Sequence, residues 1–210
     1  MNYSKKMIHT KFFATVFFCV LILNVFSAAD GSTKSAAEQP KKNQKLCYDV
    51  SVLGVTPQQT SLYELPKIFG SYKLFERGDA GEYMASACYY GKDSTTVVFN
   101  SSELGGAGRD VTNISIYQDK SSYPNNSLCL FSEVLTKELA LNRYLYLGIS
   151  RKSILNSLGV PKSSSLNKIN YEFFSKKNIK EVQYDDTCFI TVKLLNDKAV
   201  FLEVSRIISN

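Results

Sequence analysis

The sequence predicts an α+β fold of two tandem subdomains, each with short helices packed on a small antiparallel sheet. Two observations lead to this prediction. A stretch at 147–161 has the pattern of a short capped helix, and a stretch at 61–70 repeats that pattern. Segments of alternating apolar and polar residues, typical of strands, follow both stretches. A half of this size alone buries only about 60% of its unfolded surface. We therefore expect the two halves to form one continuous unit.

The helix in the second half has a signal at each end. Ser150 is a favourable N-cap, because its hydroxyl can accept a hydrogen bond from a backbone N–H of the first turn. Ile154, Leu155 and Leu158 then lie on one helical face. Gly159 suits the position that ends a helix, and Pro161 prevents its continuation.

The upstream stretch matches this pattern without a gap. Ser61 corresponds to the N-cap, Leu65 and Phe69 to the buried face, and Gly70 to the terminating glycine. The two matching stretches are the basis for expecting an internal repeat.

The remaining elements are mostly predicted strands. Alternation of apolar and polar residues predicts strands at 85–90, 95–99, 111–117, 169–174, 188–195 and 199–207. In the strand at 111–117, Ile114 and Ile116 lie on one face. The last two strands form the clearest hairpin, with Asn196-Asp197 as its turn. A Gly-rich loop at 101–110 and a polar connector at 119–127 complete the chain.

The N-terminal region is typical of an exported protein. Lysines precede an uncharged apolar run at 12–23, and small residues follow, so residues 1–29 are predicted to be a signal peptide. Cleavage after Ala29 is our prediction, and cleavage after Ser27 is the alternative. The polar stretch 30–45 is predicted to be a flexible leader.

The two subdomains then occupy residues 46–127 and 128–210. We therefore expect a periplasmic or secreted location, with no stable membrane anchor after the signal is removed.

The net charge gives little reason to expect a nucleic-acid or anionic-membrane partner. The whole chain carries 25 Lys and Arg against 19 Asp and Glu, for a net charge of +6. Removal of residues 1–29 takes away three Lys and no acidic residue, which leaves +3. A charge this small predicts no nucleic-acid partner.

Four cysteines remain after removal of the signal, and an exported chain with four cysteines is predicted to contain two disulfides. Three connectivities are possible, and we predict Cys88–Cys129 as a local link and Cys47–Cys188 as a link between distant segments. A metal site is not predicted, since no C-x-x-C pair brings two thiolates together.

The composition also limits the possible chemistry. The single histidine, His9, lies in the predicted signal, so the processed chain has none for His-dependent catalysis or zinc binding. We therefore expect no enzyme activity and no cofactor. Paired carboxylates are the remaining catalytic option, with the candidates Asp79 and Glu82, Glu103 and Asp110, or Asp185 and Asp186.

Tyrosines suggest where a binding surface lies. A tyrosine ring is apolar on its faces and polar at its tip, which suits recognition of another protein. Tyr89 and Tyr90 are adjacent in a predicted strand, so one of them is expected to face outward. Together with Glu103 and Arg109 in the Gly-rich loop, they are our candidate binding residues.

Three Asn-X-Ser triplets begin at Asn100, Asn113 and Asn125, and they are glycosylation acceptors if the source is eukaryotic. A bacterial source is the first expectation, because of the resemblance that follows. The pattern LGIS at 147–150, Ile154-Leu155, and LGVP at 158–161 resembles the opening of small envelope modules. These include the outer-membrane assembly lipoproteins of the SmpA/OmlA type and the tandem modules of the β-lactamase-inhibitor-protein kind.

The resemblance implies helices packed on a short antiparallel sheet. The chain lacks the lipid-attachment cysteine of the lipoproteins at the predicted cleavage site, so membrane anchoring does not carry over. The expected function is that of an exported, non-enzymatic, protein-binding module. The alternatives are a small-ligand carrier and a carboxylate-based hydrolase that acts on envelope polysaccharide.

Overall fold

The computed structural model describes residues 49–79, 81–136, 138–179 and 182–209, which all belong to the compact unit Ser35–Asn210. The predicted signal peptide, the predicted leader and Cys47 lie outside the described residues. The fold is mostly β, with 47% strand against 15% helix, and its described part contains two short α-helices. The predicted α+β class is therefore wrong.

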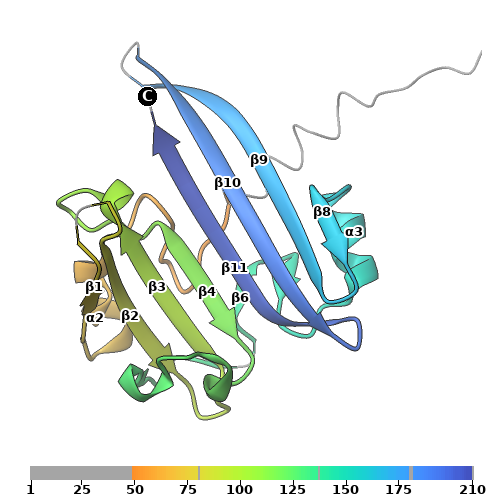
Figure 1. Ribbon diagram of the computed structural model, residues 1–210. Helices are drawn as coiled ribbons and strands as arrows, with labels where there is room; N and C mark the ends of the chain where they lie inside the picture. Colours follow the sequence, from red (N-terminus) through yellow and green to blue (C-terminus); the bar gives the residue numbers. More distant parts are fainter. Residues whose placement is uncertain (1–48, 80, 137, 180–181, 210) are drawn as a thin grey trace, which may run out of the picture. The chain divides into compact units, whose positions relative to one another are not determined.

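Helices and strands are numbered in chain order, and most of them are labelled in Figure 1. The helical elements are η1 (Leu62–Glu64), α2 (Pro66–Phe69), η2 (Glu103–Gly105), η3 (Lys120–Ser122), η4 (Asn126–Leu128) and α3 (Arg151–Leu158). The strands are β1 (Phe75–Arg77), β2 (Met84–Tyr90), β3 (Thr96–Ser102), β4 (Asn113–Tyr117), β5 (Leu130–Phe131), β6 (Ala140–Asn142), β7 (Leu145–Tyr146), β8 (Ser163–Ser165), β9 (Lys168–Ile179), β10 (Val182–Leu195) and β11 (Lys198–Ser209).

One large sheet runs through both predicted halves. Its strand order is β1-β2-β3-β4-β11-β10-β9-β8 with antiparallel neighbours, and β5 pairs with β2 in parallel (Figure 1). The strand β4 from the first half pairs with β11 from the second half, which sets Ile114 opposite Val204 and Ile116 opposite Leu202. Because this pairing joins the halves into one sheet, the prediction of two tandem helix-on-sheet subdomains is also wrong.

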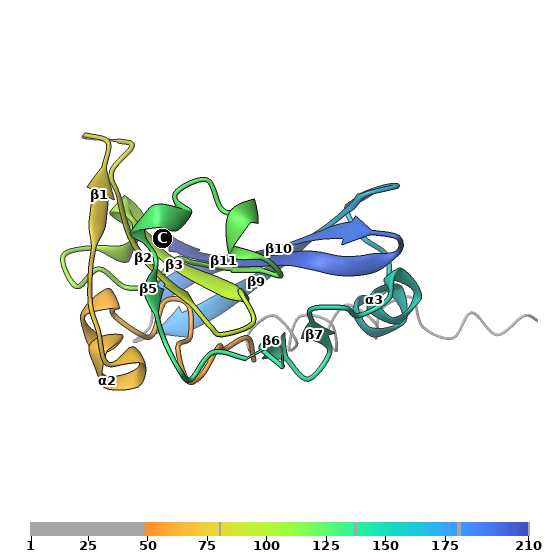
Figure 2. The same ribbon diagram turned by 90° about the horizontal axis from the view of Figure 1, so that it is seen from below.

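The core lies on one face of this sheet. In Figure 2 the sheet is seen nearly edge-on, and α2, the β6–β7 hairpin and α3 lie on the same side of it. Buried residues of these covering elements, such as Phe69, Leu141 and Ile154, form one cluster with inward-facing sheet residues such as Ile116 and Ile190. Among the described residues, the opposite face carries a small apolar cluster around Cys88, Val98 and Cys129.

The predicted helix boundaries are confirmed where the caps were predicted. Ser150 Oγ accepts a hydrogen bond from Ser153 N at 3.2 Å, and α3 ends at Gly159, whose φ is +77°. The upstream copy also begins with a capping interaction, in which the Ser61 and Glu64 side chains cap each other's backbone N–H groups. It forms a 3₁₀ turn and the four-residue α2, which ends at Gly70.

The strands predicted at 85–90, 95–99, 111–117, 169–174, 188–195 and 199–207 are also present as β2, β3, β4, β9, β10 and β11. The last three are longer than predicted, whereas β4 is shorter and begins at Asn113. The C-terminal hairpin forms as expected, and Asn196 and Asp197 turn the chain with φ of +49° and +59°. The strands β9, β10 and β11 are 12, 14 and 12 residues long, so they extend past the short β4. The strand β11 pairs with β4 along one edge and with β10 along the other, so it is the seam between the two halves.

A buried ion pair lies where β10 and β11 extend beyond β4. Both Asp186 oxygens accept from Arg206, at 3.0 Å from Nε and 2.8 Å from Nη2, and both side chains are almost fully buried. Lys177 Nζ lies 2.8 Å from Asp186 Oδ2. Burial by itself raises the pKa of Asp186, but the hydrogen bonds from Arg206 and Lys177 outweigh it and lower the pKa below its ordinary 3.8.

We predict that the Asp186→Asn substitution lowers the free energy of unfolding by about 3 kcal/mol at pH 7, because it leaves Arg206 buried without its counter-charge. The contribution of a carboxylate with a lowered pKa is present above its unfolded pKa and lost as the pH falls through the folded value. The difference between the two proteins should therefore shrink below about pH 4. Urea unfolding at several pH values measures it. The exposed neighbour is the control, and Asp185→Asn should change stability by less than about 0.5 kcal/mol. Equal effects of the two substitutions would contradict the prediction.

Candidate functional site

The uncovered face of the sheet carries a row of polar side chains that crosses four strands. Side chains alternate between the two faces of a strand, so Asn113 points away from the core that contains Ile114. The registers set Ser86 opposite Asn100, Asn100 opposite Asn113, and Asn113 opposite Ser205. This transverse row, from β2 through β3 and β4 to β11, is called the amide row below.

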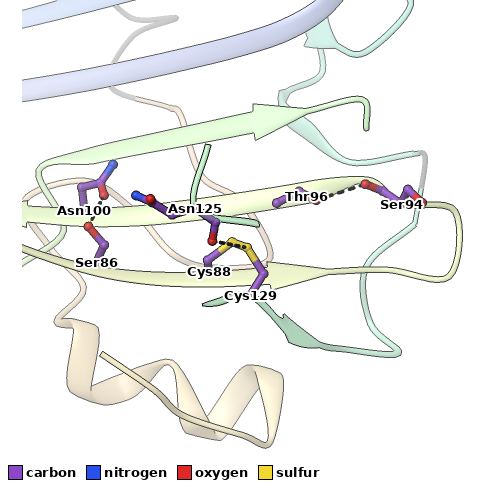
Figure 3. The surroundings of a disulfide bond; sticks show 7 residues. All are labelled: Ser86, Cys88, Ser94, Thr96, Asn100, Asn125 and Cys129. Carbon is purple, nitrogen blue, oxygen red and sulfur yellow. Dashed lines mark hydrogen bonds between the residues drawn. A yellow bond between two sulfur atoms is a disulfide. The ribbon is translucent and has the colours of Figure 1, made fainter. Parts of the chain in front are cut away.

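Hydrogen bonds connect all four members of the amide row. Ser86 Oγ donates to Asn100 Oδ1 at 2.6 Å, Asn100 Nδ2 donates to Asn113 Oδ1 at 2.9 Å, and Asn113 Nδ2 donates to Ser205 Oγ at 2.7 Å. Figure 3 shows the first of these bonds, between Ser86 and Asn100. Cross-strand contacts of this kind hold each side chain in a fixed orientation.

A short branch extends the amide row toward a carboxylate. Ser115 Oγ lies 3.1 Å from Asn113 Oδ1 and 3.0 Å from Glu203 Oε2, so its hydroxyl can donate to either oxygen. Ser115 and Ser86 are buried, whereas Asn100, Asn113, Glu203 and Ser205 are partly exposed. The buried serines therefore orient the partly exposed groups.

These side chains form the floor of a groove of about 820 Å³. The strand residues in its lining extend from β1 to β11 in the sheet order. These strands have four inter-strand spacings of about 4.8 Å, so the groove is about 19 Å long across the sheet. The walls come mainly from the β1–β2 hairpin on one side and from the connector between β4 and β5 on the other, and Leu104 of η2 and Tyr117 of β4 add to them. The wall residues are Phe75, Glu76, Arg77, Met84, Leu104, Tyr117, Tyr123, Pro124, Asn125 and Leu128.

The connector wall is held in place by a disulfide and a cation–π contact. Cys88 on β2 is bonded to Cys129 at the end of the connector, with a Cα–Cα distance of 4.5 Å (Figure 3). The next residues of the chain form β5 and pair with β2. Lys120 Nζ lies 3.6 Å from the ring centroid of Tyr90, which ties the other end of the connector to the same strand. The predicted Cys88–Cys129 link is thus present.

The other predicted disulfide is described only in part. Cys188 is disulfide-bonded, and its partner lies outside the described residues. Cys47 also lies there, so the pairing of Cys47 with Cys188 stays a prediction.

The hairpin wall is held by two of the charged residues of the 101–110 loop, Arg109 and Glu103. Arg109 forms an ion pair with Glu76 on β1, and its guanidinium lies 5.7 Å from the ring centroids of both Tyr63 and Tyr83. Glu103 accepts a hydrogen bond from the backbone N–H of Gly81 in the β1–β2 turn. Both loop side chains therefore fix the position of the hairpin that borders the groove.

Aromatic rings give the groove apolar walls beside its polar floor. The ring of Tyr117 lies 5.4 Å from that of Tyr123 and 4.8 Å from that of Phe201, measured between centroids. Burial raises the pKa of Tyr117 to about 12, so its phenol stays neutral at physiological pH. The groove therefore combines polar hydrogen-bonding groups with aromatic surface.

The four candidate binding residues from the sequence do not gather on one surface. Tyr89 is fully buried in the core, where its ring stacks on Phe69 at 4.3 Å and its hydroxyl donates to Ser71 O. Tyr90 is on the uncovered face and contacts Lys120, outside the residues that line the groove. Glu103 and Arg109 hold the hairpin wall. Three of the four thus border or support the groove, and none lines its floor.

Carboxylates are mostly engaged in contacts with other groups of the chain. In the groove, Glu203 accepts from Ser115, and Glu76 is paired with Arg109. Of the carboxylate pairs named from the sequence, Asp186 is buried in its ion pair while Asp185 is exposed. Among the described residues, no group of three His, Cys, Asp or Glu side chains is placed to bind a metal ion.

The amide row was missed from the sequence, although part of its signal is visible there. Asn113 and Ser115 alternate with Ile114 and Ile116, and Ser205 alternates with Val204, so these polar residues were expected on the face opposite the core. Asn100 and Asn113 were noted only as glycosylation acceptors. The sequence does not show that β3, β4 and β11 are neighbours in this register, and this register brings the polar residues together.

Comparison of the chain with protein-family models, with curated proteins and with solved structures found no match in any of the three. The function is therefore argued from the groove itself.

We predict that the Cys88→Ser/Cys129→Ser double substitution lowers the free energy of unfolding by about 4 kcal/mol. The disulfide closes a loop with a sequence separation of 41, and the estimate is the lost loop-closure entropy of the unfolded chain. Urea unfolding measures the change. Hydrogen exchange should also become faster in residues 119–131 than in β9 and β10. Uniformly faster exchange would contradict the assignment of this disulfide to the connector wall.

We also predict that Arg109→Gln loosens the hairpin wall, because the substitution removes the ion pair with Glu76 and the contacts with two tyrosine rings. Hydrogen exchange should become faster in residues 75–83 and stay unchanged in β10 and β11. Arg143→Gln is a matched control. The Arg143 guanidinium packs against the ring of the adjacent residue Tyr144, 4.5 Å from its centroid, and among the described residues it has no contact with the β1–β2 hairpin to lose. Unchanged exchange in β1 of the Arg109→Gln protein would show that Arg109 does not position the hairpin.

Proposed function

We propose that this chain is an exported, non-enzymatic binding protein whose recognition site is the groove on the uncovered face of the sheet. The observation that supports the proposal most is the amide row, because four hydrogen-bonded polar side chains from four strands form the floor of a walled groove. Preoriented polar groups of this kind favour binding, since little side-chain freedom is lost when a ligand arrives.

An exported location is supported by the disulfide chemistry. Disulfides persist in oxidising compartments, and Cys88, Cys129 and Cys188 are all disulfide-bonded. The predicted signal peptide belongs to the same proposal. No helix in the described part of the chain has both the length and the apolar character that a membrane span requires.

The composition of the floor favours a polar ligand over a protein surface. The cores of protein–protein interfaces are depleted in Ser and Glu, and their binding energy is concentrated in pockets for Trp, Tyr or Arg side chains. Apart from the walls, the groove is lined mainly by Ser, Thr, Asn and Glu side chains, with Val98 and Ile207 as the apolar members. A volume of about 820 Å³ is also within the range of small-molecule sites.

A protein partner, as expected from the sequence, is the second candidate. The whole sheet from β1 to β8 has seven inter-strand spacings, which make it about 34 Å wide. Leu104, at the border of the groove, is 54% exposed. A partner protein that covers this face would bury an area typical of stable complexes.

The proposal is tested by comparing three immobilised proteins for retention of material from the envelope and the medium of the source cells. The proteins are the wild type, Asn113→Ala and Asn170→Ala. Asn170 is the matched control, because it lies on the same face in a similar chain of hydrogen bonds to Ser163 and Thr191 but does not line the groove. Retention is measured by biolayer interferometry.

We expect Asn113→Ala to weaken binding about tenfold or more, since one or two lost hydrogen bonds correspond to about 1–2 kcal/mol. Asn170→Ala should bind as the wild type does. Equal retention by all three proteins would remove the groove as the recognition site. Loss of binding in both variants would assign recognition to the wider face and support the protein partner.

A further inference from the structure

The hydrogen-bonding capacity that remains on the groove floor indicates the class of ligand. Each Asn amide nitrogen has two N–H donors, and the bonds along the amide row use one from Asn100 and one from Asn113. Ser205 accepts in this row and keeps its O–H, and Glu203 keeps acceptor sites beyond the one that faces Ser115. The floor therefore presents donors and acceptors side by side.

The spacing and sign of these groups suit hydroxyl groups. Donors from Asn100, Asn113 and Ser205 lie on neighbouring strands, about 4.8 Å apart. The carboxylate of Glu203 accepts and does not donate. A hydroxyl can accept from an amide N–H and donate to a carboxylate at the same time, so a ligand with many hydroxyl groups matches this mixed pattern.

The charges in the groove argue against a strongly charged ligand. Glu203 is the one carboxylate of the floor, and the other carboxylate in the lining, Glu76, is already paired with Arg109. Among the described residues, Arg77 is the one basic side chain in the lining. A phosphate or polyacidic ligand would need a cluster of cations, and the described lining does not provide one.

The walls suit the less polar faces of sugar rings. Tyr123 and Tyr117 border the floor on the connector side, and Phe75 borders it at the β1 end. A pyranose ring has hydroxyl groups at its edge and C–H groups on its face, so it can bind polar groups and aromatic surface together. A length of about 19 Å favours a chain of sugars over a single one.

We propose that the groove binds a neutral oligosaccharide, with Asn100, Asn113, Ser205 and Glu203 bonded to its hydroxyl groups and Tyr123 packed against a ring face. Ser86 and Ser115 are positioning residues, because they are buried and orient Asn100 and Glu203. This inference rests on the proposed function, since it assigns a ligand class to the same groove.

The test uses defined oligosaccharides as probes. The wild-type protein is applied to an array of neutral oligosaccharides of three to six sugars (gluco-, manno-, xylo- and chito-oligosaccharides), together with acidic oligosaccharides and uncharged hexapeptides. We expect binding to at least one neutral series, with an affinity that increases with chain length. Binding to the acidic sugars or the peptides alone would overturn the ligand class.

Variants then connect the binding to the groove. Asn113→Ala and Tyr123→Ala should each weaken binding to the neutral oligosaccharide about tenfold, whereas the control Asn170→Ala should bind as the wild type does. If Tyr123→Ala fails to fold, as judged by its urea unfolding curve, Asn113→Ala against Asn170→Ala decides the result. Unchanged affinity of Asn113→Ala would place the sugar elsewhere and overturn the inference.

The two proposals fail in different ways. If no oligosaccharide binds but Asn113→Ala still reduces retention of material from the cell, the oligosaccharide is wrong and the groove remains the recognition site. If retention does not depend on Asn113 and no oligosaccharide binds, both proposals are wrong. Release of shorter sugars from a bound oligosaccharide would contradict the non-enzymatic part of the proposed function.

Discussion

The pairing of β4 with β11 is the contact on which the rest of the structure depends. It joins segments that are 84 to 92 positions apart in the sequence and sets the apolar Ile114 and Ile116 beside Val204 and Leu202. The same register sets Asn113 beside Ser205 on the other face. A shift of one residue would turn every β4 side chain to the opposite face. The hydrophobic side of this pairing therefore specifies the polar side, and the amide row is a consequence of a register that the core stabilises.

The covering elements of the fold lie mainly on one face. The helices α2 and α3 and the β6–β7 hairpin pack on the apolar face, so the polar face is covered only where the connector is tied down (Figure 2). The disulfide and the pairing of β5 with β2 hold the connector, and Arg109 and Glu103 hold the opposite hairpin. The groove thus has a floor made by strand register and walls made by local links. Glu103 and Arg109, which were predicted from the sequence to contact a partner, instead position the hairpin wall.

Local features of the structure could be predicted well from the sequence. Caps and turns such as Ser150, Gly159 and Asn196-Asp197 depend on a few neighbouring residues, and they formed where expected. Alternation also identified the main strands and the Cys88–Cys129 link was anticipated. The predicted fold class was wrong because alternation shows which side chains lie on each face of a strand, but it does not show which strand is adjacent in the sheet. An internal similarity then suggested two separate sheets where the chain builds one.

The candidate site was less predictable for the same reason. Asn113 and Ser205 each belong to a visible alternation, but only the β4–β11 pairing brings them to 2.7 Å of each other. Tyr89 was a candidate because tyrosine suits recognition. Its position in the alternation of β2 turns its side chain to the core face, where it packs against Phe69. Residues that act together across several strands cannot be grouped until the strand order is known.

The central claim is that the amide row is a preoriented recognition surface for hydroxyl groups. The most direct measurement is an NMR titration of the ¹⁵N-labelled protein with the neutral oligosaccharide that binds most tightly on the array, in which the side-chain NH₂ signals of the asparagines are followed. The account predicts saturable shifts for Asn100 and Asn113 and none for Asn170. Shifts at Asn170, or unshifted signals of Asn100 and Asn113 at saturation, would contradict it.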